Sequence, residues 1–211
     1  MFRAWTVTPP RRTKERKTAI SSDARGSIVC IGWGSLVWDP RDLPCGPWHD
    51  DGPSLPVEFV RESSNRRITL VIDAKAPRVR TLWTILDVQD LNAAGKALGV
   101  REYKDAGPKW IAKNIGFWTG ADDESRGREA DTIAAWAKSR ELKGAVWTSL
   151  PPKFGGVDDE VPSVDDVIAY LDALRSAERD EAEKYVRKAP LQIDTPYRQR
   201  IAAALGWTYR P

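Results

Sequence analysis

Short apolar segments typical of β-strands crowd the first half of this 211-residue chain, and helical patterns dominate the second half. This order limits the fold more than any other feature, because strands followed by helices are typical of α+β domains and not of alternating α/β ones. The predicted strands are 28–31, 57–61, 67–72, 81–86 and 145–148. We expect the strands of residues 27–150 to form a small mixed β-barrel with flanking helices.

Two helices and a long loop are predicted within the same region. Asp87 is expected to cap a helix whose apolar face includes Leu91 and Leu98, and this helix should pack against the barrel. A second helix is predicted at 131–142. Residues 104–128 mix glycine, proline and opposite charges, so we interpret them as a variable loop.

Residues that begin and end helices mark the C-terminal region, 151–211. Ser163 is followed three positions later by Asp166, which is a capping signature at the start of a long helix. A final helix, 196–205, ends at a glycine. We therefore expect a helical C-terminal extension that packs on the same domain.

The composition is that of a soluble protein. Hydrophobic residues make up 41% and charged residues 30% of the chain. No apolar run approaches the roughly 18 residues of a membrane span. The two cysteines, Cys30 and Cys45, fit a reducing compartment. We therefore predict a cytoplasmic protein with no membrane partner.

The N-terminal residues 1–26 are strongly basic. They carry seven Arg or Lys side chains and two acidic ones, a net charge of +5, which leaves −2 for the rest of the chain. Their low apolar content and Pro9-Pro10 predict a disordered arm. A basic arm can bind nucleic acid, but no recognisable nucleic-acid-binding motif accompanies this one, so we do not expect a nucleic-acid partner.

A glycine-containing loop, residues 32–35, follows the first predicted strand. It is either a tight turn or a place where bared backbone N–H groups bind an anion. It is not the G-x-S-x-G elbow of serine hydrolases, because Trp33 and Val37 occupy the glycine positions and the chain has a single histidine. It also lacks the third glycine of a dinucleotide-binding fingerprint.

Metal ligands are sparse in the sequence. Cys30, Cys45 and His49 lack the paired spacing of a zinc site, so we predict no metal. Tryptophan, in contrast, is abundant, with ten residues. The tryptophans suit either an aromatic core or a cleft with aromatic walls.

Three short motifs follow one another between residues 32 and 102. The first, Gly32-Trp33-Gly34-Ser35-Leu36-Val37-Trp38, resembles the G-Y-G-S-L-[IV]-W segment of the ChaC-type branch of the γ-glutamylcyclotransferase-like superfamily. Residues 59–63 with 68–71 are similar to its F-x-x-x-S…T-L-V strand pair, and 98–102 to the L-x-x-R-E that ends the following helix. The motifs occur in the family's order, although Trp33 replaces a tyrosine and the chain from about Lys104 matches nothing in that family.

The resemblance implies an enzyme that releases 5-oxoproline and an amine from a γ-glutamyl peptide or amine. The α-amine of the glutamyl group attacks the γ-carbonyl of the same molecule, so neither a metal nor a cofactor is needed. Glu102 is the implied catalytic acid–base group. The implied substrate-binding residues are Gly32, Trp33, Gly34, Ser35, Leu36 and Trp38.

Other interpretations of these residues stay open. Glu102 is also explained as a charge at a helix end that pairs with Arg101 or Lys104. The alternative function is a catalytically silent member of the fold that binds a small molecule or a protein. The unmatched helical tail and the replaced tyrosine favour this alternative.

Charged residues of the first strand pair also allow two interpretations. Arg61 and Arg67 either bind a substrate carboxylate or form structural ion pairs. Glu58 and Glu62 share strand parity, so they are rivals of Glu102 if both point inward.

Overall fold

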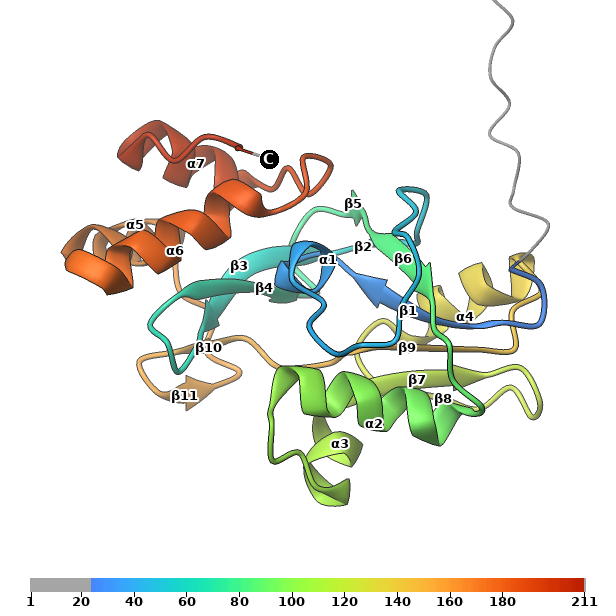
Figure 1. Ribbon diagram of the computed structural model, residues 1–211. Coiled ribbons are helices and arrows are strands. Elements are labelled where there is room, and N and C mark those ends of the chain that lie inside the picture. Colours follow the sequence, from blue (N-terminus) through green and yellow to red (C-terminus); the bar gives the residue numbers. More distant parts are fainter. Residues whose placement is uncertain (1–23, 211) are drawn as a thin grey trace, which may run out of the picture.

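Three β-sheets and seven helices make up residues 24–210, the part of the chain that this computed structural model describes (Figure 1). The five-stranded sheet has the order β6 (Leu82–Ile85), β1 (Ile28–Gly32), β9 (Gly144–Thr148), β7 (Ile115–Thr119) and β8 (Ser125–Arg126). The four-stranded sheet has the order β11 (Val157–Asp158), β10 (Lys153–Phe154), β3 (Val57–Glu62) and β4 (Ile68–Ile72). The third sheet pairs β2 (Ser54–Leu55) with β5 (Val79–Arg80).

The predicted α+β class is confirmed, but the strands of residues 24–210 do not close into a barrel. The five-stranded sheet is covered by helices on both faces, with α2 (Leu91–Glu102) on one side and α4 (Ala130–Ser139) on the other (Figure 1). All five residues of β1 are buried. A central strand that is buried on both faces indicates a layered sheet.

Side-chain alternation along β1 builds two separate cores. Ile28 and Cys30 belong to the core that includes Leu98 of α2. Val29 and Ile31 belong to the larger core, which includes residues of α4 and of the C-terminal helices. β1 pairs in parallel with β9 and antiparallel with β6, so it lies inside the sheet.

The interpretation of residues 104–128 as a variable loop is wrong. This segment contains α3 (Pro108–Asn114) and the strands β7 and β8, and β7 lies within the five-stranded sheet. The strand pattern is weak because Gly116 interrupts it; a Cβ at Gly116 would lie 2.3 Å from the Trp147 ring. Trp118 is buried and donates from Nε1 to the carboxylate of Asp123 at 2.9 Å.

Helix boundaries follow their capping residues. α2 begins at Leu91 with Asp90 as its N-cap, and Asp87 lies one turn too early for that role. The capping box of Ser163 and Asp166 is confirmed at the start of α5 (Val164–Ala173). The chain then breaks at Leu174, so the predicted long helix is two helices, α5 and α6 (Ser176–Lys188).

The last helix ends where the sequence predicts. α7 (Pro196–Leu205) stops at Gly206, whose φ of +71° lies in the left-handed region that glycine adopts freely. α4 ends at Ser139, three residues before the predicted end, and Arg140 is its C-cap.

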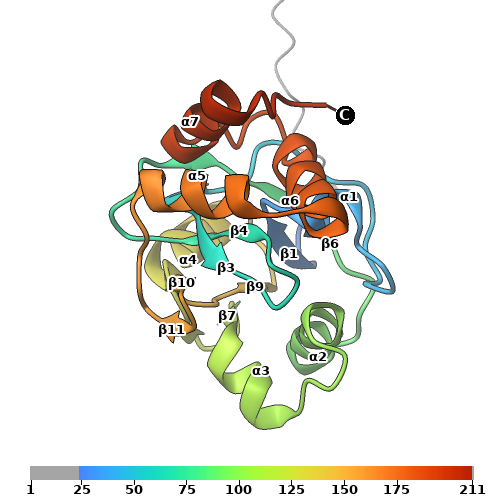
Figure 2. The ribbon, with the colours of Figure 1, turned by 90° about the vertical axis from the view of Figure 1, so that its left-hand side faces the viewer.

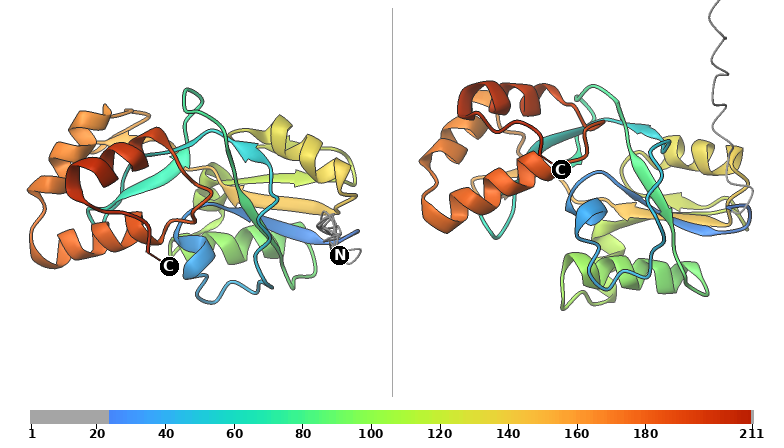
Figure 3. Two further views of the ribbon diagram at one scale, coloured as in Figure 1. Left: turned by 90° about the horizontal axis from the view of Figure 1, so that it is seen from above. Right: turned by 45° about the horizontal axis from the view of Figure 1, so that its top comes forward.

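The three C-terminal helices form a layer over the four-stranded sheet (Figure 2). Figure 3 shows this layer at one end of the molecule and α4 at the other. α6 contacts β4, and α7 contacts β3. The carboxylate of Glu58 on β3 anchors α7, because it accepts hydrogen bonds from the Thr195 hydroxyl and from the backbone N–H of Tyr197.

The N-terminal end of the described chain is part of the folded domain. Ala24 is 4% exposed and belongs to the larger core. Arg25 pairs with Glu141 at 2.7 Å. Most of the predicted basic arm, residues 1–23, lies outside the described residues.

The described tryptophans mostly build the core. Five of them are at most 3% exposed, so the aromatic-core interpretation accounts for most of the tryptophan content: Trp33, Trp83, Trp118, Trp147 and Trp207. In the described part of the chain, no helix has the length and apolar character needed to cross a membrane.

Candidate functional site

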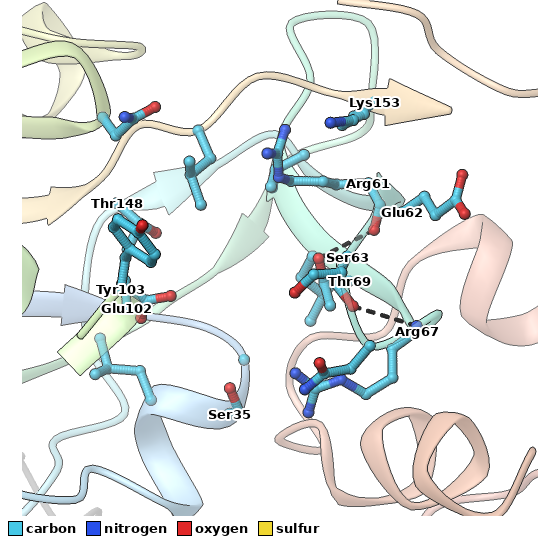
Figure 4. A pocket seen from close by; sticks show the side chains of 18 of the residues that line it. Ser35, Arg61, Glu62, Ser63, Arg67, Thr69, Glu102, Tyr103, Thr148 and Lys153 are labelled. Carbon is cyan, nitrogen blue, oxygen red and sulfur yellow. Dashed lines mark hydrogen bonds between the residues drawn. The ribbon is translucent and has the colours of Figure 1, made fainter. Parts of the chain in front are cut away.

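A cavity of about 770 Å³ lies where the two larger sheets meet. One side, which we call the loop wall, consists of residues 32–36 together with Arg101 and Glu102 at the end of α2. The opposite side, the hairpin wall, consists of residues 61–67 and 69–71 of the β3–β4 hairpin together with Tyr185 of α6. Figure 4 shows side chains of both walls around this space.

The cavity brings together the acid–base and substrate-binding residues that the sequence suggests, with one exception. Gly32, Trp33, Gly34, Ser35, Leu36 and Glu102 all line it. Trp38 lies outside the cavity wall, and its ring packs edge-on against that of Tyr185 at a centroid distance of 5.4 Å. Trp33 reaches the wall, but its indole is held in the core, where Nε1 donates to the Leu70 carbonyl at 3.1 Å.

The glycines of the loop allow aromatic rings to approach the backbone. A Cβ at Gly32 would lie 2.7 Å from the ring of Trp48, and a Cβ at Gly34 would lie 2.5 Å from the Tyr185 hydroxyl. The loop is therefore a tight structural turn and a cavity wall at once. It leads into the short helix α1 (Ser35–Trp38), whose N-cap is Gly34, so no N-cap side chain accepts from the first backbone N–H groups of this helix.

Arg101 links Glu102 to the loop. Its Nη1 donates to Glu102 Oε1 at 2.6 Å, and its Nη2 donates to Ser35 Oγ at 3.3 Å, across 66 positions of sequence. Nη2 also donates to the carbonyl of Asp39 at 2.6 Å. The local pairing of Glu102 with Arg101 is thus confirmed, but the Arg101 side chain is only 5% exposed, so this is not a solvated surface pair.

The cavity has an excess of positive charge. Seven Arg or Lys residues and three Asp or Glu residues line it, an excess of four. Such a concentration of one charge sign favours anionic ligands. The basic residues are Arg41, Arg61, Arg66, Arg67, Arg101, Lys113 and Lys153, and the acidic ones are Glu62, Glu102 and Asp158.

The two arginines of the first strand pair have different surroundings. Arg61 donates to the Pro151 carbonyl at 2.6 Å and lies 3.7 Å from Asp158, so the ion-pair interpretation holds for it. Burial lowers the pKa of Arg61, and the charge of Asp158 opposes this shift. Arg67 has no such partner among residues 24–210.

The two glutamates of β3 also differ, although they share strand parity. Glu58 points away from the cavity, into the contact with α7. Glu62 does line the cavity, but its two oxygens accept hydrogen bonds from the Tyr170 hydroxyl at 3.0 Å and from the backbone N–H of Gly155 at 3.1 Å. Of these two glutamates, only Glu62 therefore remains an alternative to Glu102 as the acid–base group.

Tyr185 was missed altogether in the sequence, and Arg101 was identified there only as a local partner of Glu102. Arg101 stands beside Glu102 in the motif, but its contact with Ser35 depends on the fold. Tyr185 is a lone aromatic residue in the charged helix α6, and it is buried with Ala182 and Val186. The spacing of these three residues marks a buried helix face, but nothing local indicates that the face meets Gly34.

Neither a metal site nor a reactive cysteine is evident among residues 24–210. Among residues 24–210 there is no cluster of three or more His, Cys, Asp or Glu side chains placed to share a metal ion. Cys30 is fully buried, and burial raises the pKa of its thiol far above the usual range. Cys30 is a core residue of the sheet and not a nucleophile.

Comparisons of the chain with protein-family models, with curated proteins and with solved structures find no match in any of the three. We therefore infer the function from the geometry of the cavity and from the three sequence motifs.

Proposed function

We propose that this protein is a γ-glutamylcyclotransferase-like enzyme, which releases 5-oxoproline and an amine from a γ-glutamyl peptide or amine. One observation supports the proposal above the others. Glu102 and the loop of residues 32–36, which belong to separate motifs, line the same cavity and are linked through Arg101. Residues that act on the same substrate must line the same cavity, and these residues do.

The proposed reaction needs one group that first accepts and then donates a proton. Glu102 takes a proton from the α-ammonium of the glutamyl group, and the freed amine attacks the γ-carbonyl to form the new C–N bond of the ring. The tetrahedral intermediate then expels the leaving amine, which receives its proton from Glu102. The regenerated carboxylate takes the second proton of the ring nitrogen and passes it to the released amine, which departs as an ammonium group. The atoms balance without water, because nucleophile and electrophile belong to one molecule.

The loop wall offers the hydrogen-bond donors that this reaction requires. The developing oxyanion on the γ-carbonyl is stabilised by donors that are already in place. The Ser35 hydroxyl and the uncapped backbone N–H groups at the start of α1 are suited to this role. Arg101 is the positioning residue, since its guanidinium fixes the carboxylate of Glu102 relative to Ser35.

The charge of the cavity agrees with such a substrate. A γ-glutamyl peptide carries at least one carboxylate, and the cavity has an excess of four positive charges. A larger peptide with further carboxylates also fits a space of about 770 Å³.

The alternative function, a silent binding module, is favoured by one feature of the same site. The carboxylate of Glu102 already accepts a 2.6 Å hydrogen bond from Arg101, and Trp33 has no phenolic hydroxyl to offer. In that case the cavity binds an anion without turnover.

A panel of γ-glutamyl compounds, assayed for 5-oxoproline, separates the two functions. We expect turnover by the wild type and a loss of about 10²- to 10⁴-fold in Glu102→Gln, which keeps the shape of the side chain but cannot accept the proton. Glu62→Gln tests the rival carboxylate on the same cavity and should stay within a few-fold of the wild type. Turnover by Glu102→Gln at the wild-type rate contradicts the assignment, and absence of turnover throughout favours the binding module.

A further inference from the structure

Arg67 is the exception among the basic residues of the cavity. Within residues 24–210, each of the other six lies within 3.9 Å of a carboxylate, whereas Arg67 forms no ion pair. Its Nε is buried and has no hydrogen-bond partner among these residues, as is true of Arg101 Nε. The terminal nitrogens of Arg101, however, donate to protein acceptors, whereas no donation from the Arg67 guanidinium is found among the same residues. A buried charged donor without an acceptor is costly, so its presence at a cavity wall indicates a ligand.

The fold holds the guanidinium of Arg67 in place. The backbone N–H of Arg67 donates to Ser63 Oγ at 3.2 Å, a contact drawn in Figure 4, and this fixes the base of the side chain at the hairpin turn. The guanidinium carbon lies 5.4 Å from the centre of the Tyr185 ring, a cation–π contact. A cation that is held by a ring face and a turn is already arranged for a ligand.

Tyr185 adds a hydroxyl group beside this cation. Its oxygen accepts a hydrogen bond from the Leu70 backbone N–H at 3.2 Å, and no acceptor for its hydrogen lies within reach in the described part of the chain. Burial raises the pKa of Tyr185 to about 12, so the phenol is protonated at neutral pH and can donate. The close approach of the hydroxyl to Gly34 places it where the two walls meet.

We propose that Arg67 and Tyr185 form a carboxylate-binding subsite that holds the α-carboxylate of the γ-glutamyl group. That the bound group is the α-carboxylate of a γ-glutamyl substrate rests on the function proposed above. The planar fork of arginine matches a carboxylate, and the phenol donates a further hydrogen bond to it. In the view of Figure 4, Ser35 lies between Glu102 and Arg67. A glutamyl chain bound along this line has its carboxylate at Arg67 and its γ-carbonyl at the loop.

This subsite gives the C-terminal extension a part in the reaction. The α-carboxylate is attached to the carbon that bears the attacking amine, so its binding fixes the direction of that amine. The subsite therefore selects substrates by their glutamyl group and does not depend on the identity of the leaving amine. Compounds that lack a free α-carboxylate should be excluded.

The test uses binding, so that it does not depend on turnover. Wild type and variants are titrated by calorimetry with the product 5-oxoproline, with 2-pyrrolidinone, which lacks only the carboxylate, and with glutarate as a second carboxylate probe. We expect 5-oxoproline to bind the wild type about 10- to 100-fold more tightly than 2-pyrrolidinone, the usual range for a charged hydrogen bond. Arg67→Gln should remove this preference, and Arg67→Lys should restore part of it.

Two further variants control the experiment. Tyr185→Phe should weaken 5-oxoproline binding by less than Arg67→Gln does, and its melting temperature shows whether the core is intact. Arg80→Gln removes a similar charge from an exposed position that is not part of the cavity wall, and it should leave binding unchanged.

Each outcome bears on one of the two proposals. If Arg67→Gln binds 5-oxoproline and glutarate as tightly as the wild type, the subsite is overturned, whatever the activity of Glu102→Gln. If the wild type binds glutarate through Arg67 but does not bind 5-oxoproline, the carboxylate subsite stands and the γ-glutamyl assignment falls. If the wild type binds neither, the subsite is overturned.

Discussion

On the loop wall of the cavity, both terminal nitrogens of Arg101 are engaged, because Glu102, Ser35 and the Asp39 carbonyl accept from them. Only its Nε is buried without a partner among residues 24–210. On the hairpin wall, the guanidinium of Arg67 has a ring face below it and no carboxylate beside it among residues 24–210. An arginine whose terminal nitrogens donate to the protein organises structure, whereas one whose terminal nitrogens have no protein acceptor is available to a ligand. On our proposals, Arg101 on the loop wall positions Glu102, and Arg67 on the hairpin wall binds the ligand.

The comparison predicts that the loop wall loses most when its cation is removed. Arg101→Ala leaves Glu102 beside a cavity without its partner and frees Ser35 from its tether. Because the Arg101 side chain is only 5% exposed, we expect a loss of about 3 kcal/mol in the free energy of unfolding, as for a broken buried pair. Urea denaturation measures this loss.

Arg25→Ala is the matched control for this prediction. Arg25 pairs with Glu141 at 2.7 Å, but both side chains are more than half exposed. Such a surface pair contributes at most about 1 kcal/mol. If both variants lose the same free energy of unfolding, the ion pair of Arg101 contributes no more to stability than an exposed surface pair.

Gly34→Ala tests the point where the two walls touch. The new Cβ would lie 2.5 Å from the Tyr185 hydroxyl, so the tyrosine or the loop must move. We expect a cost of about 1–3 kcal/mol, typical of overpacking. In Tyr185→Phe the obstructing oxygen is gone, so the double variant should be more stable than the sum of the two single effects predicts. Simple additivity in the double-mutant cycle would mean that the walls are not in contact there.

The smallest expected effect is the pH dependence of the stability that Glu58 contributes where it anchors α7. Burial raises the pKa of Glu58 above its usual value of 4.5, while hydrogen bonds from Thr195, Phe59 and Tyr197 oppose the shift. A group with a raised pKa in the folded state stabilises fully below its usual pKa and loses that contribution as the pH rises through the raised value. The stability of the wild type relative to Glu58→Gln should therefore fall as the pH rises from about 4.5.

Urea unfolding of both proteins across this pH range measures the effect. The relevant quantity is the difference in the free energy of unfolding between the wild type and Glu58→Gln, because all other carboxylates titrate in both proteins. A difference that grows with pH would mean that the hydrogen bonds to Glu58 outweigh its burial.

The loop wall was accessible from the sequence, and the hairpin wall only in part: Arg61 and Arg67 were candidates for binding a substrate carboxylate, but Tyr185 was not. Ser35 and Glu102 stand in short motifs whose order along the chain predicted a shared site, and both line the cavity. Tyr185 lies in a charged helix, and its role depends on how α6 packs against the loop, which is a tertiary contact without a local pattern. Local sequence indicates which face of a helix is buried but not what the face will meet.

The barrel expected from the strand content failed for a related reason. β7 was hidden because Gly116, which makes room for Trp147, interrupts its pattern. Without that strand, β9 lacked the neighbour that extends the sheet beyond it, and the clustering of strands in the first half of the chain favoured a barrel. Burial on both faces of β1 is visible only when the helices are placed.

The pairing of β1 with β9 has a consequence for synthesis of the chain on the ribosome. β6 can cover one edge of β1 early, but Ile28 pairs with Gly144 on the other edge, so that edge must wait until most of the protein has been made. Until then an apolar strand presents unpaired backbone groups, which is a known risk for association between nascent chains. Completion of the central sheet is thus a late and non-local event, and we expect it to set the rate at which newly made molecules escape aggregation.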